Sequence, residues 1–449
     1  MSWIVNSKVE KVFLLLGVVF GLIFLITTPP FQSPDEYAHF FRAYTISEGQ
    51  FIPTQGATLP RSIVEFSVRV SPDPLPGNDQ NKQSKKALLE QFQQPFSDLE
   101  RVPINLNGTI SYSPIAYLPQ TLGILAGRFL RLSPILIFYL GRLVNLTAWI
   151  GLVFLALRIT PIYKWLLLAL ALMPMSIFQA ASNSPDCPLN AFSLLFIAAS
   201  LRLAFSPEIK VEAQDILRLS IPLILISAIK PAYLVLAGLF LLIPEKRCGG
   251  LLRYAVAGLS LLGLAFIPAL TWLFLTRGAL NISGNGNPAD QLQFIQAFPF
   301  DFLRILWNSM SGQIIVQWKM WVGVLGWLDT PLPGFIYVLM LPLLVLIALF
   351  DHRPDIHIPA SAKVFSGFLF LGTWVGIFSV FFVTWTQVGM NPIDGVQGRY
   401  FIPVSALLFL PFYNQRFQPP RGWGLITIVS LAFVLIVSLR MLFARFYSI

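Results

Sequence analysis

Ionisable residues gather directly behind the first membrane-length apolar run of the chain. Residues 33–42 read SPDEYAHFFR and contain two acids, a histidine and an arginine: Asp35, Glu36, His39 and Arg42. Carboxylates and imidazoles can act as general bases or acids near neutral pH. Charged groups at the edge of a bilayer are costly unless they are exposed or used. The segment therefore predicts chemistry at a membrane surface.

The same segment can also be read as a helix start. Ser33 fits an N-cap, and Glu36 three residues later would close a capping box. Asp35, His39 and Arg42 are not explained in this way. They stand at i, i+4 and i+7, so a helix would carry them on one face. Three ionisable groups on one face favour a functional site.

A second acid follows a later apolar run. Residues 182–188 read SNSPDCP, so the tripeptide Ser-Pro-Asp again precedes an apolar segment. Asp186 is explained either as an N-terminal acid that favours the helix dipole or as a functional group. In the second case, Asp35 and Asp186 could hold a divalent ion, or act as a base and an orienting acid.

Candidate phosphate-binding residues lie near the carboxyl end. Residues 394–403 read DGVQGRYFIP, in which Gln397, Arg399 and Tyr400 begin an apolar run. A guanidinium suits phosphate oxygens, although an Arg-Tyr pair can also anchor at headgroup depth. The two glycines favour phosphate contact, since an anchor does not need a free backbone. Lys230 is a further candidate cation, or else a lysine that snorkels from a helix end.

Three weaker signals concern aromatic residues and a charge in an apolar run. Tyr112 and Tyr117 could line an acceptor groove, although aromatics are common at membrane interfaces. Arg142 lies inside an apolar run and needs an acidic partner, such as Asp35 or Glu36. Several tryptophans could stack on sugar rings, although an aromatic belt explains them as well: Trp307, Trp318, Trp321 and Trp327.

Composition defines the class of protein. Hydrophobic residues make up 55% of the chain and charged residues 12%, and the mean hydropathy is +0.70. Most of the chain must therefore lie in lipid. The net charge of +10 needs no nucleic acid as a partner, because Lys and Arg concentrate in cytoplasmic loops next to lipid headgroups. Two cysteines exclude a disulfide framework.

The apolar runs predict an all-α polytopic protein with about eleven transmembrane helices. The expected spans are 12–29, 135–157, 163–181, 187–205, 219–229, 232–243, 251–275, 334–350, 364–385, 400–413 and 422–443. Residues 219–243 divide at Lys230-Pro231 into two short halves, which predicts a hairpin with Lys230 near its tip. Residues 115–132 are expected to be an interfacial helix.

Loop charges orient these spans. With the amino terminus in the cytoplasm and 115–132 on the outer surface, most short-loop Lys and Arg residues face the cytoplasm. Asp35, Asp186, Lys230 and Arg399 then share the extracytoplasmic face. The chain is expected to be one integral-membrane domain, 1–449. Within it lie a first extracytoplasmic loop with interfacial helices, core helices and a variable carboxy-terminal transmembrane part: 30–134, 135–275 and 276–449.

The motifs resemble those of the GT-C superfamily of integral-membrane glycosyltransferases. The likeness rests on the acidic pair behind the first span, YSPIAY at 112–117, RLVN at 142–145, the acidic loop 182–186 and IKP at 229–231. More closely, SPDEYAHF at 33–40, SPD at 184–186 and QGRYFIP at 397–403 are similar to motifs of a bacterial family of predicted membrane proteins without an assigned function. This closer likeness covers nearly the whole chain.

The GT-C resemblance implies transfer of a sugar from a polyprenyl-phosphate donor to a glycan, lipid or protein acceptor of the cell envelope. The reaction would occur on the extracytoplasmic face of the bacterial plasma (inner) membrane. Asp35, Glu36 and Asp186 would be the catalytic acids, supported by His39, Arg42 and Tyr112. The donor phosphate would be held by Arg399, Lys230, Gln397 and Tyr400. Whether the reaction needs a divalent ion, Mg²⁺ or Mn²⁺, stays open; Asp35 and Asp186 would be its ligands.

Other functions remain open on the residues alone. A lipid or polysaccharide transporter would also need acids and cations within the membrane, although usually with internal repeats that the chain lacks. A structural subunit of an envelope complex would use the acids only to cap helices. No recognisable soluble domain follows the last span, so we expect an enzyme of this kind to bind its acceptor with outer loops.

Overall fold

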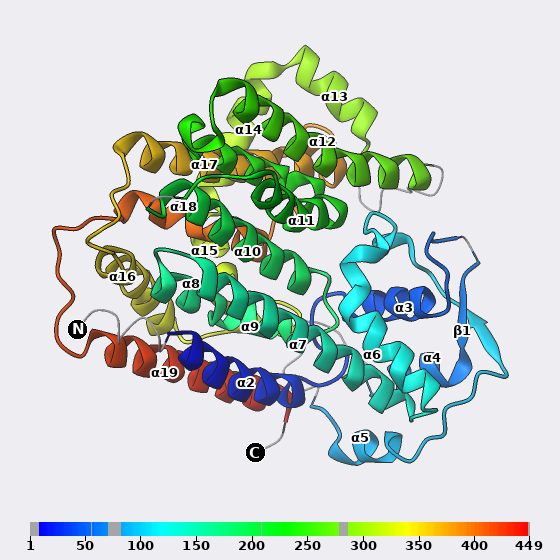
Figure 1. The fold of residues 1–449 in the computed structure, drawn as a ribbon. Coiled ribbons are helices and arrows are strands. Elements are labelled where there is room, and N and C mark those ends of the chain that lie inside the picture. The colour runs from blue at the N-terminus through cyan, green and yellow to red at the C-terminus, as the bar shows by residue number, and fades with distance from the viewer. Residues whose placement is uncertain (1–8, 55, 71–81, 208, 278–285, 448–449) are drawn as a thin grey trace.

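The computed structural model describes residues 9–54, 56–70, 82–207, 209–277 and 286–447. Helices dominate it (Figure 1). Six helices are long and apolar enough to cross a membrane: α2 (Val9–Thr27), α7 (Pro134–Ile159), α10 (Asp186–Phe205), α12 (Leu251–Thr276), α17 (Ala360–Thr384) and α19 (Trp423–Phe446). The described residues therefore form an all-α, multi-pass architecture.

The other five expected spans are short or interrupted. Residues 163–181 divide into α8 (Lys164–Ala171) and α9 (Pro174–Ala180), because Pro174 cannot donate a helical hydrogen bond. Residues 400–413 fall into η5 (Gly398–Val404), α18 (Ser405–Phe409) and η6 (Leu410–Phe412). The remaining three are α11 (Ala213–Ile229), the 3₁₀ helix η3 (Pro231–Leu242) and α16 (Gly334–Phe350).

The predicted hairpin around Lys230 is present. Helix α11 packs against η3, and Lys230 lies at the turn between them. At the open end, the backbone N–H of Val211 donates to the carbonyl of Arg247 at 2.9 Å. The two halves therefore run side by side, and both ends of the hairpin lie away from Lys230.

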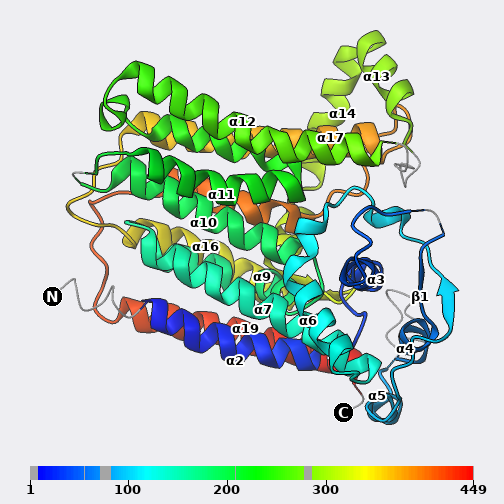
Figure 2. The same cartoon turned by 45° about the vertical axis from the view of Figure 1, so that its right-hand side comes forward.

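The long helices form a stack in which each contacts the next. Following the contacts, the order is α19, α2, α7, α10, α11 and α12. Figure 2 shows these helices side by side, and α17 packs against η3. Helix ends and loops that meet at one end of this stack can build a site from segments that are far apart in the sequence.

The segment after α2 forms a lobe at one end of the bundle (Figure 2). Its elements are α3 (Glu36–Ser47), β1 (Thr58–Pro60), α4 (Arg61–Val70), α5 (Lys85–Gln91), β2 (Arg101–Pro103), η1 (Asn107–Thr109), η2 (Pro114–Tyr117) and α6 (Leu118–Phe129). Strands β1 and β2 pair antiparallel, with Thr58 opposite Pro103. Helix α6, the expected interfacial helix, packs against both α7 and α3.

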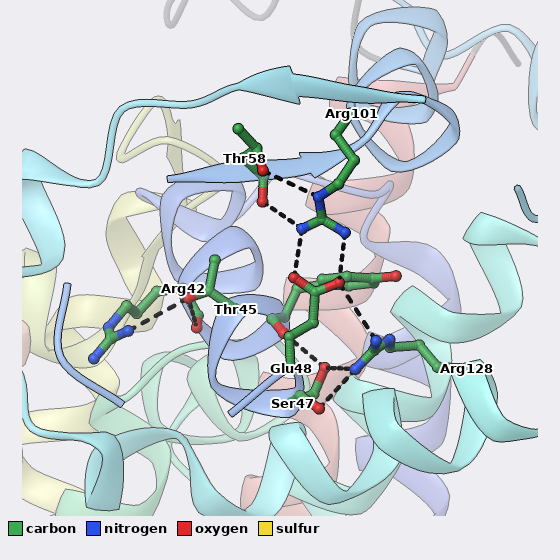
Figure 3. A network of polar contacts seen from close by, with 8 residues as sticks. Arg42, Thr45, Ser47, Glu48, Thr58, Arg101 and Arg128 are labelled. Atoms are coloured by element: carbon green, nitrogen blue, oxygen red, sulfur yellow. Dashed lines mark hydrogen bonds and ion pairs between the residues drawn. The ribbon is translucent and has the colours of Figure 1, made fainter. Parts of the chain in front are cut away.

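An ion-pair network ties α3 to the rest of this lobe (Figure 3). Glu48, just after α3, accepts hydrogen bonds from Arg101 at 2.7 and 3.0 Å and contacts Arg128 at 3.4 Å. Arg128 also donates to the backbone carbonyl of Ser47 at 2.6 Å. These contacts join the end of α3 to β2 and α6, which holds α3 against the bundle.

The remaining elements follow the core helices. They are η4 (Glu245–Cys248), α13 (Pro288–Ala297), α14 (Pro299–Gly312), α15 (Ile314–Gly323), β3 (Val324–Leu325) and β4 (Thr330–Pro331). Helix α15 packs against η5, which carries Arg399. A Cβ on Gly398 would lie 2.1 Å from the carbonyl oxygen of Gln317 in α15, so only glycine permits this contact.

Candidate functional site

The start of α3 differs from the predicted capping box. Helix α3 begins at Glu36, and the preceding residue Asp35 has a left-handed backbone with φ of 60° and no side-chain cap. Ser33 is therefore not the N-cap, and Glu36 does not close a box. Instead, Glu36 forms a fully buried ion pair with Arg142 of α7, at 2.6 Å between Oε2 and Nη2. The expectation that Arg142 needs Asp35 or Glu36 is thus confirmed for Glu36.

The carboxylate of Glu36 joins the two acid-bearing loops. It accepts the backbone N–H of Phe31 at 3.1 Å and that of Asn183 at 2.9 Å. Asn145 of α7 supports the second loop by donating to the carbonyls of Ser182 and Ser184. Glu36 is therefore a positioning residue that fixes the loop before Asp35 to the loop before Asp186.

Asp35 and Asp186 both face Arg399. The distance to the Arg399 guanidinium is 3.8 Å from Asp35 and 3.7 Å from Asp186. The Asp35 side chain is 56% exposed, whereas those of Asp186 and Arg399 are 9% and 6% exposed. The two acids therefore lie on either side of the same cation, and Asp35 is the more accessible of the two.

Asp186 is surrounded by hydrogen-bond donors. Its Oδ1 atom accepts from Lys230 at 2.8 Å, and its Oδ2 atom accepts from the Gln179 amide of α9 at 3.1 Å. Gln179 is in turn held by the Asn190 amide at 3.0 Å. Asp186 is an anion that orients cations rather than a free base.

Lys230 lies between two tyrosine rings. Its ammonium is 5.3 Å from the centre of the Tyr112 ring and 4.8 Å from that of Tyr400. Burial favours the neutral amine, but the charge of Asp186 raises the pKa of Lys230 well above its usual value. Lys230 therefore stays a cation, and Tyr112 and Tyr400 hold it in place.

Arg399 is a buried guanidinium with unused donors. Its Nε atom has no hydrogen-bond partner within the described residues, and its two acid contacts are longer than a hydrogen bond. The buried Oε1 atom of the neighbouring Gln397 likewise lacks a partner in that part of the chain. Buried polar groups are usually satisfied, so these two groups are available to a polar ligand.

The glycines near Arg399 have packing roles. Gly398 permits the close approach to α15, and Gly395 has φ of +82° with Trp385 against it. Their presence is explained without a ligand, so the preference for phosphate over an anchor rests on the unused donors of Arg399 instead.

The three residues expected on one face of α3 have separate partners. His39 contacts the Tyr117 hydroxyl through Nδ1 at 3.0 Å. Burial lowers the pKa of His39 to about 3, so its ring is neutral at pH 7. Arg42 instead donates to the carbonyls of Gln50 and Phe51, at 2.9 and 2.5 Å, and to the Thr45 hydroxyl at 3.3 Å (Figure 3). Arg42 holds its own loop and does not join the cluster.

The cluster fits a metal ion poorly. Within the described residues, no group of three or more His, Cys, Asp and Glu side chains could hold one. Asp35 and Asp186 are the nearest candidates, yet both face Arg399, and Asp186 also binds Lys230. A cation between the two acids would have to displace a guanidinium. A divalent ion therefore does not fit between the two acids.

Sequence reasoning missed several residues that build this site. Gln179 contacts Asp186 and stands outside the acidic motifs, whereas Asn183 contacts Glu36 and lies in the acidic loop 182–186, where its own side chain carries no charge. Tyr117 was noticed only as a possible groove residue, and its contact with His39 spans 78 positions. Such long-range partners have no local signal in a single sequence.

A bundle of apolar helices with an acid–cation cluster at one end defines a multi-pass membrane protein. The chain belongs to the family described as predicted membrane protein (DUF2142), whose match covers residues 18–408 and thus the whole cluster. No curated protein and no solved structure matches the chain.

Proposed function

We propose that this protein is a membrane glycosyltransferase that moves a sugar from a polyprenyl-phosphate donor to an acceptor of the cell envelope. The observation that carries the proposal is the juxtaposition of an exposed carboxylate, Asp35, with a buried and incompletely bonded guanidinium, Arg399. Glycosyl transfer from a lipid phosphate requires a group of each kind, a base for the acceptor and a cation for the leaving phosphate.

The proposed reaction uses these groups in one displacement. The acceptor hydroxyl oxygen forms a bond to the anomeric carbon of the sugar, and its proton passes to Asp35. The bond between that carbon and the phosphate oxygen breaks, and the electron pair stays on the departing lipid phosphate. Arg399 and Lys230 balance the charge that develops there. Gln397 and Tyr400 border the same phosphate position.

Asp186 has a different role from Asp35 in this proposal. It binds Lys230 directly and faces Arg399, so it orients both cations without blocking the unused Nε–H of Arg399. His39 is neutral and, with Tyr117 and Tyr112, forms the wall beside Lys230. Preorganised cations of this kind stabilise charge without rearrangement during the reaction.

The proposal places the site on the extracytoplasmic face of the bacterial plasma membrane, with the amino terminus in the cytoplasm. It keeps the GT-C-like arrangement of about eleven spans, in which the shorter segments cross with a tilt or as a hairpin. Support comes from the hairpin at Lys230 and from the meeting of four candidate residues at the same end of the bundle.

The test is transfer of radiolabelled sugar from a panel of polyprenyl-phosphate donors by the purified protein. Wild type is compared with Asp35→Asn and Asp186→Asn at equal amounts of folded protein. We expect label to reach an acceptor or water with wild type only. No turnover by wild type, with polyprenyl-phosphate binding unchanged in both variants, would overturn the proposal and favour a lipid or polysaccharide transporter.

A further inference from the structure

An aromatic pair lies next to the loop that carries Asp35. Trp327 is at the turn between β3 and β4, and its indole N–H donates to the backbone carbonyl of Phe31 at 2.9 Å. Its ring stacks on Tyr37, with 6.1 Å between ring centres and 21° between planes. Thus a hairpin near residue 327 reaches the first outer segment, almost 300 positions earlier in the chain.

Tyr37 is the accessible half of this pair. It is 46% exposed, with one ring face against Trp327 and an edge contact to Phe41. Only one residue separates it from Asp35, so their Cα atoms are at most about 7 Å apart. An exposed aromatic surface thus lies beside the most exposed acid of the cluster.

The backbone around the pair adopts unusual conformations. Phe31, Asp35 and Leu328 all have positive φ, between 60° and 65°. At the turn, a Cβ on Gly326 would lie 2.3 Å from Oδ1 of Asp329, so the turn requires glycine. Such conformations persist only where the surrounding structure holds them, and they concentrate at functional sites. A solely lipid-facing aromatic belt would need none of them.

We infer that Tyr37, supported by Trp327, binds a sugar ring of the acceptor, so the acceptor is a glycan. The inference rests on the proposed function, in which Asp35 contacts the acceptor hydroxyl. The cations Arg399, which is buried, and Lys230, which is partly buried, lie on the donor side, and the exposed aromatic surface adjoins Asp35. Asp35 and Tyr37 are two positions apart in the chain, so a sugar bound on Tyr37 would lie close to this carboxylate. Apolar faces of sugars stack on aromatic rings as other flat apolar surfaces do.

Kinetics with soluble oligosaccharide acceptors test this assignment. Tyr37→Leu keeps apolar area but loses the ring, and we expect the acceptor KM to rise about 3- to 10-fold with the donor KM unchanged. Tyr37→Phe keeps the ring and should give a smaller effect. Trp307→Ala is the matched control, because Trp307 is 70% exposed on α14 and has no place in the site. Equal acceptor KM values for Tyr37→Leu and wild type would overturn the inference.

Direct binding separates this inference from the proposed function. The probes are trisaccharides of glucose, galactose, mannose and N-acetylglucosamine, measured by saturation-transfer NMR on the full chain in detergent. Binding that weakens in Tyr37→Leu but not in Trp307→Ala supports the glycan site even if no sugar is transferred. Transfer that prefers non-sugar acceptors, with no trisaccharide bound, would overturn the glycan site and leave the glycosyltransferase intact.

Discussion

Two adjacent acids, Asp35 and Glu36, have opposite environments. Glu36 is fully buried and accepts hydrogen bonds from Arg142 and from two backbone N–H groups. Asp35 is 56% exposed, and its ion pair with Arg399 is 3.8 Å long. A one-residue step in the sequence thus separates a carboxylate that builds the fold from one that is available to a ligand.

The two arginines differ in the same way. Arg142 uses all five of its N–H groups, on both Glu36 oxygens and on the carbonyls of Leu25, Thr28 and Pro29. The guanidinium of Arg399 makes no hydrogen bond within the described residues, although its side chain is only 6% exposed. A satisfied buried ion pair supports structure, and an unsatisfied one retains the capacity to bind. The following variants test that difference.

Glu36→Gln should have the largest effect, and it should act on folding. It leaves Arg142 as a buried unpaired charge, which costs about 3–5 kcal/mol of stability. We expect a large loss of monodisperse protein in detergent and a marked fall in Tm. The double variant Glu36→Gln/Arg142→Met should recover part of this loss, because no unpaired charge remains. A normal Tm with abolished transfer would instead assign Glu36 to the chemistry.

Asp35→Asn should act on transfer and leave the fold intact. Removing a general base lowers the rate about 10²- to 10⁴-fold. The side chain is 56% exposed with one long contact, so Tm should stay within about 1 °C of wild type. Measuring kcat and Tm on the same preparation decides the point. A stability loss like that of Glu36→Gln would mean that Asp35 also holds the fold together, and the proposed difference between the two acids would be wrong.

Arg399→Gln should lower kcat about 10²- to 10³-fold, as expected for loss of a donor to developing charge. Arg399→Lys keeps the charge without the planar fork and should retain part of the activity. The matched control is Arg42→Gln, which removes a buried arginine outside the cluster and should affect Tm rather than kcat. Similar kinetics for both arginine variants would contradict a phosphate role for Arg399.

The sequence predicted that the site residues lie at the same end of the helix bundle. The lengths of the apolar runs and the charges of the loops indicate which loops lie on the same side of the membrane. Asp35, Asp186, Lys230 and Arg399 follow from that reasoning. The environment of Glu36 was not predictable. Locally, SPDE fits a capping box, whereas the partner Arg142 is 106 positions away. A local pattern cannot reveal a distant competitor for the same carboxylate.

Helix interruptions were also missed, for a different reason. Run length predicts one helix over 163–181, and hydropathy hides the effect of Pro174. The break is still relevant to the site, since it gives α9 its own direction and brings Gln179 to Asp186. Apolar length indicates how much chain lies in lipid, whereas proline positions indicate where that chain bends.

Protonation of His39 should have the smallest effect on stability. It tests whether the histidine ring beside Lys230 is neutral or charged in the folded protein. Burial, together with Arg399 and Lys230, lowers its pKa, and Asp186 opposes them; the value in the folded state is about 3, below the ordinary value of 6.5. The unfolded chain therefore binds the proton first, so stability is full above pH 6.5 and falls as the pH approaches 3. The loss at pH 5.5 is about 1.4 kcal/mol, or about 2–4 °C in Tm.

His39→Gln should lack this pH-dependent loss, measured as Tm at pH 7.5 and 5.5 beside wild type. Parallel curves for the two proteins would mean that His39 keeps its ordinary pKa of 6.5 in the folded state, so that it becomes a third cation of the site as the pH falls below that value.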